Sequence, residues 1–265
     1  MTAERRRDSG RQSRPFYHEF AWAFDLIIDR PVERDCAVIV NWLVERGVVP
    51  GSTLLDAGCG TGRYARELAR RGYLVHGIDV SLDLLEEAKR SAGQSPQITF
   101  TPGNILALPA SRDDAVLCRG VLNDLVDDGD RRSAFASFAQ ALRRNGVLIL
   151  DVRDWDATAN RKQREPLFRK RVDTSRGKLT FTSVTELDRE HHQLIVRESH
   201  ALESHGRERV VKHEFVMKCW TMAELESLLD LNGFGLVSTF GAYDPAIGLG
   251  ATDRLVVVAQ LATKT

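Results

Sequence analysis

The sequence predicts an α/β protein built on a seven-stranded, doubly wound sheet, with an N-terminal helical cap and a small antiparallel lid sheet. From residue 51 onward, short apolar segments alternate with helical patterns, which is typical of parallel βαβ construction. A glycine-rich turn at residues 58–62 joins the first of these segments to a helix. After residue 154 apolar and polar residues alternate, which indicates antiparallel strands with one solvated face.

The length of 265 residues suffices to bury the core of one such domain together with an elaboration. We expect five segments along the chain. They are a flexible basic tail at 1–14, the helical cap at 15–50, a core with the glycine-rich turn at 51–155, an antiparallel lid insertion at 156–220, and a C-terminal helix with strands that complete the core sheet at 221–265.

Helices are expected in the cap and between the core strands. Residues 16–28 carry apolar side chains at helical spacing, and Pro31 stands where a first-turn proline opens a second helix to about residue 46. Thr221 and Glu224 form a capping-box pattern that opens a helix to residue 232. Further helices are expected at 63–71, from residue 82, and at 131–144, where Asn145-Gly146 would end the last of them.

The strands fall into two groups, because the apolar runs of the core differ from the alternating pattern that follows it. The main-sheet strands are predicted at 53–57, 74–78, 98–101, 115–118, 147–152, 236–240 and 255–260. The lid strands are predicted at 178–188, 191–203 and 207–220, with His191-His192 and residues 204–206 at the turns.

Charge and composition argue against several classes of partner. The formal net charge is zero, so no global field attracts nucleic acid, although Arg5, Arg6, Arg7, Arg11 and Arg14 could form a local basic footprint. No apolar run approaches the ~20 residues that span a bilayer, and the first 14 residues lack the apolar stretch of a secretory signal. We therefore expect neither nucleic acid nor a membrane as partner.

The four cysteines, Cys36, Cys59, Cys118 and Cys219, have no metal-ligand spacing and lie within predicted elements or the glycine-rich turn. A thiol in such a position behaves as a small apolar group, which is typical of a protein in the reducing cytoplasm. The pair His191-His192 indicates a hairpin turn rather than a metal site, since nothing nearby completes a ligand set. No metal site is predicted.

The glycine-rich turn favours a ligand that approaches the backbone closely. Gly58, Gly60 and Gly62 alternate, whereas the dinucleotide pattern G-x-G-x-x-G would need glycine where Arg63 stands. Asp79 ends the next predicted strand, and a carboxylate there can accept both hydroxyls of a ribose. The alternative is that Asp79 is only a charge at the start of the following helix.

These residues resemble the motifs of class I S-adenosylmethionine-dependent methyltransferases. Residues 54–62 (Leu-Leu-Asp-Ala-Gly-Cys-Gly-Thr-Gly) resemble the first motif, and 76–81 (His-Gly-Ile-Asp-Val-Ser) the second. Residues 103–109 are similar to the third motif, 114–125 to the fourth, and 146–151 to the fifth strand. The order of the motifs also agrees, which makes the set far more specific than any one motif.

The resemblance, which covers about residues 40–155, implies a Rossmann-like fold, an enzyme and S-adenosyl-L-methionine as cofactor. It implies that Asp56, Gly58 and Gly60 hold the methionine end, with Cys59 in the same loop, and that Asp79 holds the ribose. Further cofactor contacts are implied for Val80 and Leu84 at the adenine, Asn104 and Ile105 at its edge, Arg119 and Gly120 after the fourth strand, and Tyr17 as a cover. Where the third motif usually has aspartate this chain has Asn104, whose amide can still accept from the adenine amino group.

Asp124 is the candidate base or acceptor anchor, because it follows the fourth strand at the carboxyl end of the sheet, where ligands lie in open α/β folds. The alternative is an acid that favours a helix start in the cluster 123–130. Tyr17 could likewise only pack among Phe16, Phe20 and Trp22. We expect Trp220 in the core, and Tyr243 either in the core or at a pocket.

The predicted function is methyl transfer to an N or O nucleophile of a small molecule. The lid resembles the small sheet of glycine and sugar N-methyltransferases, which covers the substrate and often joins subunits, and similar elaborations occur in small-molecule O-methyltransferases. A homodimer through the lid sheet is therefore possible. Two alternatives stay open: an RNA or protein methyltransferase, and a relative that binds the cofactor without transferring methyl.

Overall fold

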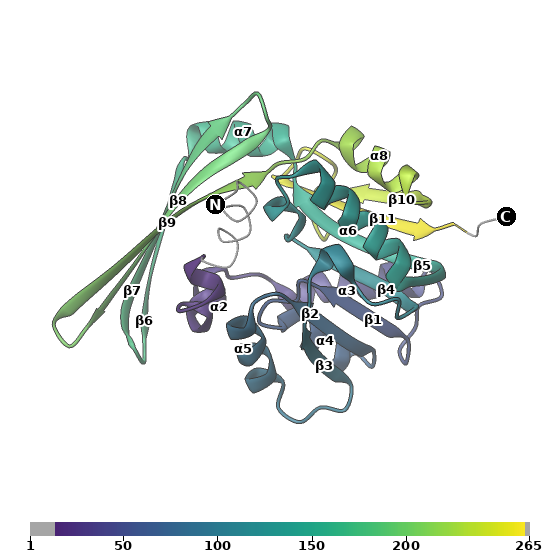
Figure 1. Ribbon diagram of the computed structural model, residues 1–265, viewed down its shortest axis with the longest axis horizontal. Helices are drawn as coiled ribbons and strands as arrows, with labels where there is room; N and C mark the ends of the chain where they lie inside the picture. The colour runs from purple at the N-terminus through teal and green to yellow at the C-terminus, as the bar shows by residue number, and fades with distance from the viewer. Residues whose placement is uncertain (1–13, 263–265) are drawn as a thin grey trace, which may run out of the picture.

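The computed structural model describes residues 14–262, so the expected basic tail lies, apart from Arg14, outside the described residues. A seven-stranded sheet forms the body of the protein, in the order β10-β11-β5-β4-β1-β2-β3 (Figure 1). Its strands are β1 (Thr53–Ala57), β2 (Leu74–Asp79), β3 (Ile98–Pro102), β4 (Asp113–Arg119), β5 (Leu142–Arg153), β10 (Phe234–Phe240) and β11 (Arg254–Leu261). β11 is antiparallel to both of its neighbours, and the pairings among β1 to β5 are parallel. The predicted fold class is confirmed.

Helices cover both faces of this sheet because its strands are apolar at consecutive positions. In β1, Leu54 and Leu55 are almost completely buried on opposite faces. One layer contains α3 (Val32–Val44), α4 (Arg63–Arg70) and α5 (Leu82–Ala92). The other layer contains α6 (Asp128–Ala141) and α8 (Met222–Leu231), and Trp220 lies in the core of this side, as predicted.

The helix expected at 131–144 is shifted toward its N-terminus. The Asp127 carboxylate accepts hydrogen bonds from Gly129 and Asp130 at 2.8 and 3.3 Å, and this cap starts α6 at Asp128. Asn145-Gly146 does not end the helix. Leu142 already pairs with Asp113 in the sheet, and Asn145, with φ of 58°, lies in an irregularity of β5 instead.

The expected helix at 16–28 is wrong. The segment consists of two 3-10 turns, Pro15–Tyr17 and Ala21–Ala23, followed by the short helix α2 (Phe24–Ile27). An α-helix would pair the Ala21 amide with the Tyr17 carbonyl. Here the Tyr17 carbonyl accepts from the Ser81 hydroxyl, and the Ala21 amide donates to the His18 carbonyl instead. The helically spaced apolar side chains are nevertheless buried. They are Phe16, Phe20, Ala23 and Ile27.

The lid is a separate antiparallel sheet, as predicted, but it has four strands in the order β6-β7-β8-β9. They are β6 (Leu167–Thr174), β7 (Gly177–Asp188), β8 (Gln193–Ser204) and β9 (Arg207–Lys218), preceded by α7 (Trp155–Arg164). The prediction missed α7 and β6, since β6 is largely exposed and charged and pairs only as an edge strand.

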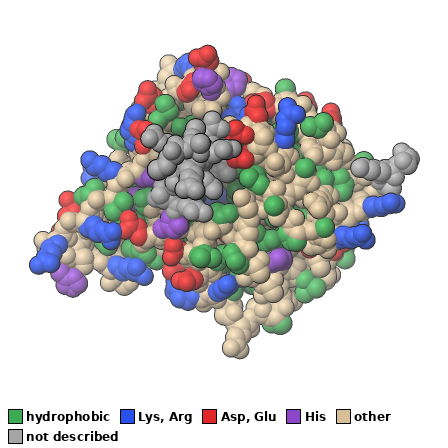
Figure 2. Space-filling view, in the orientation of Figure 1, with side chains coloured by type: hydrophobic (Ala, Val, Ile, Leu, Met, Phe, Trp, Pro, Cys, Tyr) green, Lys and Arg blue, Asp and Glu red, His purple; other side chains and the backbone are tan. Residues whose placement is uncertain are grey.

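The lid projects from the core as a long twisted ribbon, with α2 beside it (Figure 1). Its inner face packs Leu179 and Phe181 against Phe16 and Phe20. Lys and Arg side chains gather over the far end of the lid (Figure 2). No helix among residues 14–262 combines the length and apolar character that a membrane crossing requires.

Candidate functional site

The glycine-rich turn lies between the carboxyl end of β1 and the start of α4. Gly58, Gly60 and Gly62 all have positive φ, at 79°, 55° and 69°. A Cβ at Gly58 would lie 2.3 Å from Val121 Cγ2, and one at Gly62 would lie 2.5 Å from Phe100 Cζ. At Gly60 it would meet no atom of residues 14–262 within 4 Å. The outer glycines therefore allow close packing, and around the middle one the described part of the chain leaves room.

Asp79 fastens this turn to the end of β2. Its Oδ2 accepts from the Gly60 amide at 2.8 Å, and its Oδ1 accepts from the Ser81 amide at 2.9 Å. Burial raises the pKa of Asp79, and the backbone hydrogen bonds from Ser81 and Gly60 oppose that rise. Each carboxylate oxygen can accept a second hydrogen bond, so Asp79 keeps acceptor capacity for a diol.

Asp56 is a buried carboxylate beneath the same turn. Its side chain accepts from the Ala65 amide, but its Oδ2 has no hydrogen-bond partner in the described part of the chain. Burial raises the pKa of Asp56 to about 7, and the Arg119 charge opposes that rise. A buried acceptor without a donor is costly, which marks this oxygen as a position for a ligand that carries a donor or a positive charge.

Arg119 points under the sheet edge rather than toward the glycine-rich turn. Its Nε donates to the Tyr243 hydroxyl at 2.9 Å, and its Nη2 lies 3.4 Å from Asp35 and 3.5 Å from Asp151. The guanidinium carbon lies 3.3 Å from the centre of the Tyr64 ring. Arg119 therefore ties β4 to its neighbours, and Tyr243 lies in this buried ionic cluster.

Arg30 is a residue that sequence reasoning missed. A Cβ at Gly120 would lie 3.5 Å from Arg30 Nη2 and 3.8 Å from Asp151 Oδ1, so the guanidinium lies beside the end of β4. Within residues 14–262 its side chain has no hydrogen bond or ion pair. Burial lowers the pKa of Arg30 to about 10, with a further contribution from Arg254. No local pattern distinguishes Arg30 in the sequence, because its neighbours come from the fold.

Tyr17 and Asp124 meet above the carboxyl end of the sheet. The Tyr17 hydroxyl donates to Asp124 Oδ2 at 2.8 Å, and it accepts from Arg14 Nη1 at the same distance. The Tyr17 carbonyl accepts from the hydroxyl of Ser81, which follows Asp79 by two residues. The N-terminal segment therefore crosses the edge that carries Asp79 and Asp124.

The residues expected at the adenine differ in exposure. Val80 is 52% exposed, and Asn104 is exposed with its side-chain oxygen accepting from the Leu106 amide at 3.0 Å. Leu84 and Ile105 are only 2% and 5% exposed. Val80 and Asn104 thus offer surface to a ligand, whereas Leu84 and Ile105 are buried in this structure.

Two further positions do not face the site as ligand-binding side chains. The Cys59 thiol packs against the sheet, where a Cβ at Gly77 would lie 2.9 Å from its Sγ, and burial raises the pKa of Cys59. His191 lies in the β7–β8 turn and pairs with Asp188 at 2.9 Å. Among residues 14–262 no group of three or more His, Cys, Asp or Glu side chains could hold a metal ion.

A family model matches the part of the chain that carries the motifs. Residues 54–146 match the family model for a methyltransferase domain. With the strand order described above, this match shows that the chain has the class I S-adenosylmethionine-dependent methyltransferase fold, and the resemblance seen in the motifs is confirmed.

Among its relatives, a glycine/sarcosine N-methyltransferase of Aphanothece halophytica is 34% identical over 108 residues, which cover 39% of this chain and 41% of the relative. A magnesium-protoporphyrin O-methyltransferase of Synechocystis is 38% identical over 88 residues, which cover 32% and 38%. A methyltransferase-like protein of Geobacillus is 31% identical over 140 residues, which cover 51% and 57%. The chain therefore spans about half the length, or less, of these relatives.

Solved structures match over most of the chain. A S-adenosylmethionine-dependent methyltransferase from Clostridium acetobutylicum has a TM-score of 0.77 at 20% identity and covers 93% of this chain and 99% of its own. The sugar N-methyltransferase KedS8 from Streptoalloteichus has a TM-score of 0.73 at 15% identity and covers 93% of each chain. These likenesses establish the fold.

The orphaned carboxylate predicts a pH dependence of stability. The folded-state pKa of Asp56, about 7, lies above its ordinary 3.8, so its stabilising contribution is present below pH ~4 and is lost as the pH rises through 7. Asp56→Asn removes this titration. Relative to the Asn variant, the wild type should lose up to about 4 kcal/mol of unfolding free energy between pH 4 and pH 8, measured by urea denaturation without cofactor.

The exposed Asp156 supplies the matched control, since Asp156→Asn should leave the pH dependence nearly unchanged. Parallel pH curves for the wild type and the Asp56→Asn variant would contradict the assignment of a raised pKa to Asp56.

Proposed function

We propose that this protein is an S-adenosylmethionine-dependent methyltransferase that moves a methyl group to an N or O nucleophile of a small molecule. The observation that carries the proposal is the methyltransferase-domain match over a sheet edge where Asp79 holds an open glycine turn. Relatives named for glycine/sarcosine and for magnesium-protoporphyrin support a small-molecule acceptor.

The charges at this edge suit S-adenosylmethionine as cofactor. Its methionine end is a zwitterion, and two groups of opposite sign are incompletely satisfied within residues 14–262. Arg30, beside the end of β4, would bind the carboxylate, and Asp56 Oδ2, at the end of β1, would bind the ammonium. Asp79 has acceptor capacity for the ribose hydroxyls. Val80 offers apolar surface to the adenine, and Asn104 offers an amide to its edge.

The cofactor supplies an electrophilic methyl group when it is bound, so the protein needs mainly to align the acceptor and exclude water. The lid and the Tyr17 segment would cover the reacting atoms. Asp124 would accept the proton that the acceptor loses, and the hydrogen bond from Tyr17 holds one of its oxygens in place. Arg119 would have a positioning role, because its guanidinium contacts Tyr243, Asp35 and Asp151.

The function is tested by titrating the protein with S-adenosylmethionine, S-adenosylhomocysteine and NAD in a calorimeter. Both sulfur compounds should bind, and NAD should not. Asp79→Asn should weaken their binding by one to several decades, because two charge-assisted hydrogen bonds of roughly 1.5–3 kcal/mol each are impaired. Tight binding of NAD alone would reject the assignment.

The same titration addresses the methionine end. Arg30→Met should weaken S-adenosylmethionine binding and leave adenosine binding almost unchanged, whereas Asp79→Asn should weaken both. If the protein binds S-adenosylmethionine but forms no S-adenosylhomocysteine with any acceptor, a relative that does not transfer methyl is favoured. Turnover of RNA or protein only would favour the macromolecular alternative.

Asp124 is the candidate base, and Asp124→Asn tests it with little change of shape. Turnover should fall by about 10²-fold or more while cofactor affinity is nearly unchanged, measured as S-adenosylhomocysteine release and by calorimetry. If Asp124 only favours the local turn, the change should cost at most ~1 kcal/mol of stability and little activity, because Asn suits helix starts well.

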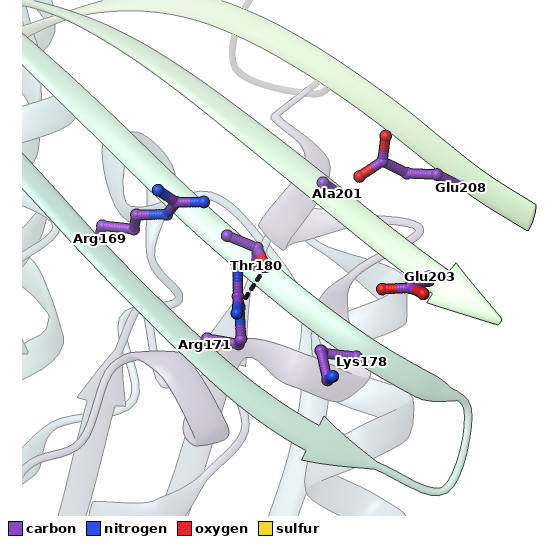
Figure 3. A pocket seen from close by; sticks show the side chains of 7 residues that line it. All are labelled: Arg169, Arg171, Lys178, Thr180, Ala201, Glu203 and Glu208. Carbon is purple, nitrogen blue, oxygen red and sulfur yellow. Dashed lines mark hydrogen bonds between the residues drawn. The ribbon is translucent and has the colours of Figure 1, made fainter. Parts of the chain in front are cut away.

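The outer face of the lid supports a homodimer. It carries the exposed apolar side chains Leu167, Val184, Val210 and Val216, which are 37–58% exposed. The same face has a cavity of about 160 Å³, with basic residues on β6 and β7 and acidic residues on β8 and β9 (Figure 3). A two-fold contact would place each basic half against the partner's acidic half.

Cytoplasmic localisation stays a prediction from the cysteines.

Sedimentation velocity tests the dimer. The wild type should sediment as a dimer, and Val184→Glu should sediment as a monomer, because the contact would bury a charge. Val49→Glu is the control, since Val49 is 47% exposed and lies outside the lid. A monomeric wild type would contradict the proposal.

A further inference from the structure

An arginine side chain lies between the lid and the core. Arg14 Nη2 is 2.9 Å from Glu198 Oε1 on β8, and its Nη1 donates to the Tyr17 hydroxyl at 2.8 Å. Its guanidinium carbon lies 4.0 Å from the centre of the Phe215 ring on β9. A carboxylate, a phenol oxygen and an aromatic face thus surround one cation.

Glu198 is 4% exposed, and its ion pair within residues 14–262 is with Arg14. The two histidines on the same face of the lid do not supply a second positive charge. Burial lowers the pKa of His200 to about 4, and burial also lowers the pKa of His213, which pairs with Glu198 across the strands. Without Arg14, the lid would therefore present a buried carboxylate without a counter-ion.

The position of this cation is close to the candidate base. Tyr17 joins the two, since its hydroxyl lies 2.8 Å from both Arg14 Nη1 and Asp124 Oδ2. Arg14 belongs to neither the lid nor the core sheet, and its backbone carbonyl accepts from the Tyr17 amide at 2.8 Å. One guanidinium thus pairs with Glu198 directly and is linked to Asp124 through the Tyr17 hydroxyl.

We propose that this cage of Glu198, Phe215 and Tyr17 is the acceptor site, and that a protonated amine of the acceptor takes the place of the Arg14 guanidinium there. The inference rests on the proposed methyltransferase function and narrows its acceptor to amines. Arg14 is then an internal competitor for the site.

Acceptors of other charge suit this cage poorly. A carboxylate would meet Glu198 and Asp124, which are both negative. A neutral hydroxyl that displaced Arg14 would leave Glu198 buried without a counter-ion, which is costly. An ammonium group replaces the charge of the guanidinium, and Asp124 can accept the proton of that ammonium before the methyl group is transferred.

Binding of simple probes tests the cage without turnover. Benzylammonium, benzyl alcohol and benzoate would be titrated into the full chain saturated with S-adenosylhomocysteine, with detection by ligand-observed NMR. Arg14→Ala should bind benzylammonium at least tenfold more tightly than the wild type does, and more tightly than it binds benzyl alcohol or benzoate. Adding Glu198→Gln to Arg14→Ala should abolish this preference.

The matched control adds Glu186→Gln to Arg14→Ala, because Glu186 lies on the same sheet but is exposed and paired with Arg197. This double variant should keep the preference for the cation. Circular dichroism identifies any variant that fails to fold. In that case the test uses Glu198→Gln alone, which should bind benzylammonium more weakly than the wild type does.

An Arg14→Ala chain that binds S-adenosylhomocysteine but shows no preference for benzylammonium would overturn the inference and leave the proposed function intact. So would S-adenosylhomocysteine release with phenols or carboxylic acids and none with amines. Failure of the chain to bind either sulfur cofactor would instead reject the proposed function.

Discussion

A buried carboxylate, Asp151, fixes the sheet edge on which the site depends. It is completely buried, and although burial alone would raise its pKa, Arg254, Arg119 and Arg30 hold that pKa at about 2. Arg254 lies on β11 and Arg119 on β4, so one negative charge joins three adjacent strands at their ends. Removing one partner of such a cluster would leave a buried charge without compensation, which is strongly destabilising. The cluster therefore keeps the ends of β4, β5 and β11 in register.

The same electrostatic logic continues into the glycine turn, with the opposite outcome. Asp79 accepts hydrogen bonds from two backbone amides, and one of them, from Gly60, fixes the turn to the end of β2. Asp56, two residues before Gly58, has an oxygen without a donor within residues 14–262, and the Arg30 side chain has no hydrogen bond or ion pair within the same range. A protein retains such groups where a ligand satisfies them, since each is costly when it stays unpaired. Asp79 thus both fixes the turn and keeps acceptor capacity for a ligand, whereas Asp56 and Arg30 contribute charges that a ligand would pair.

The sequence predicted the seven main strands from short apolar segments, most clearly in β1, β5 and β11, where consecutive residues are apolar. It predicted the glycine turn because alternate glycines have few other uses. The motif resemblance implied Arg119 as a cofactor contact and did not indicate its side-chain direction, although Arg119 alternates with its neighbours on β4 and shares a face with Leu117 and Ala115. Strand β6 could not be predicted in this way: its pattern is mostly charged and exposed, and only pairing with β7 makes it a strand. Arg30 and the bent segment at 15–28 were missed for a related reason, because their partners are distant in sequence.

The acceptor region has no motif of its own because three separate segments meet to form it. Phe16 and Phe20 pack on the lid through Phe181 and His200, while Tyr17 between them turns toward Ser81 and Asp124 on the core. In a regular helix the Tyr17 carbonyl would accept from the Ala21 amide, so it could not accept from the Ser81 hydroxyl of the core as it does here. The break in helix geometry therefore connects lid and core, because Arg14 and the Tyr17 phenol together link Glu198 of the lid to Asp124 of the core. The family match is confined to residues 54–146, whereas Arg14, Tyr17, Glu198 and Phe215, which form the proposed acceptor site, all lie outside it.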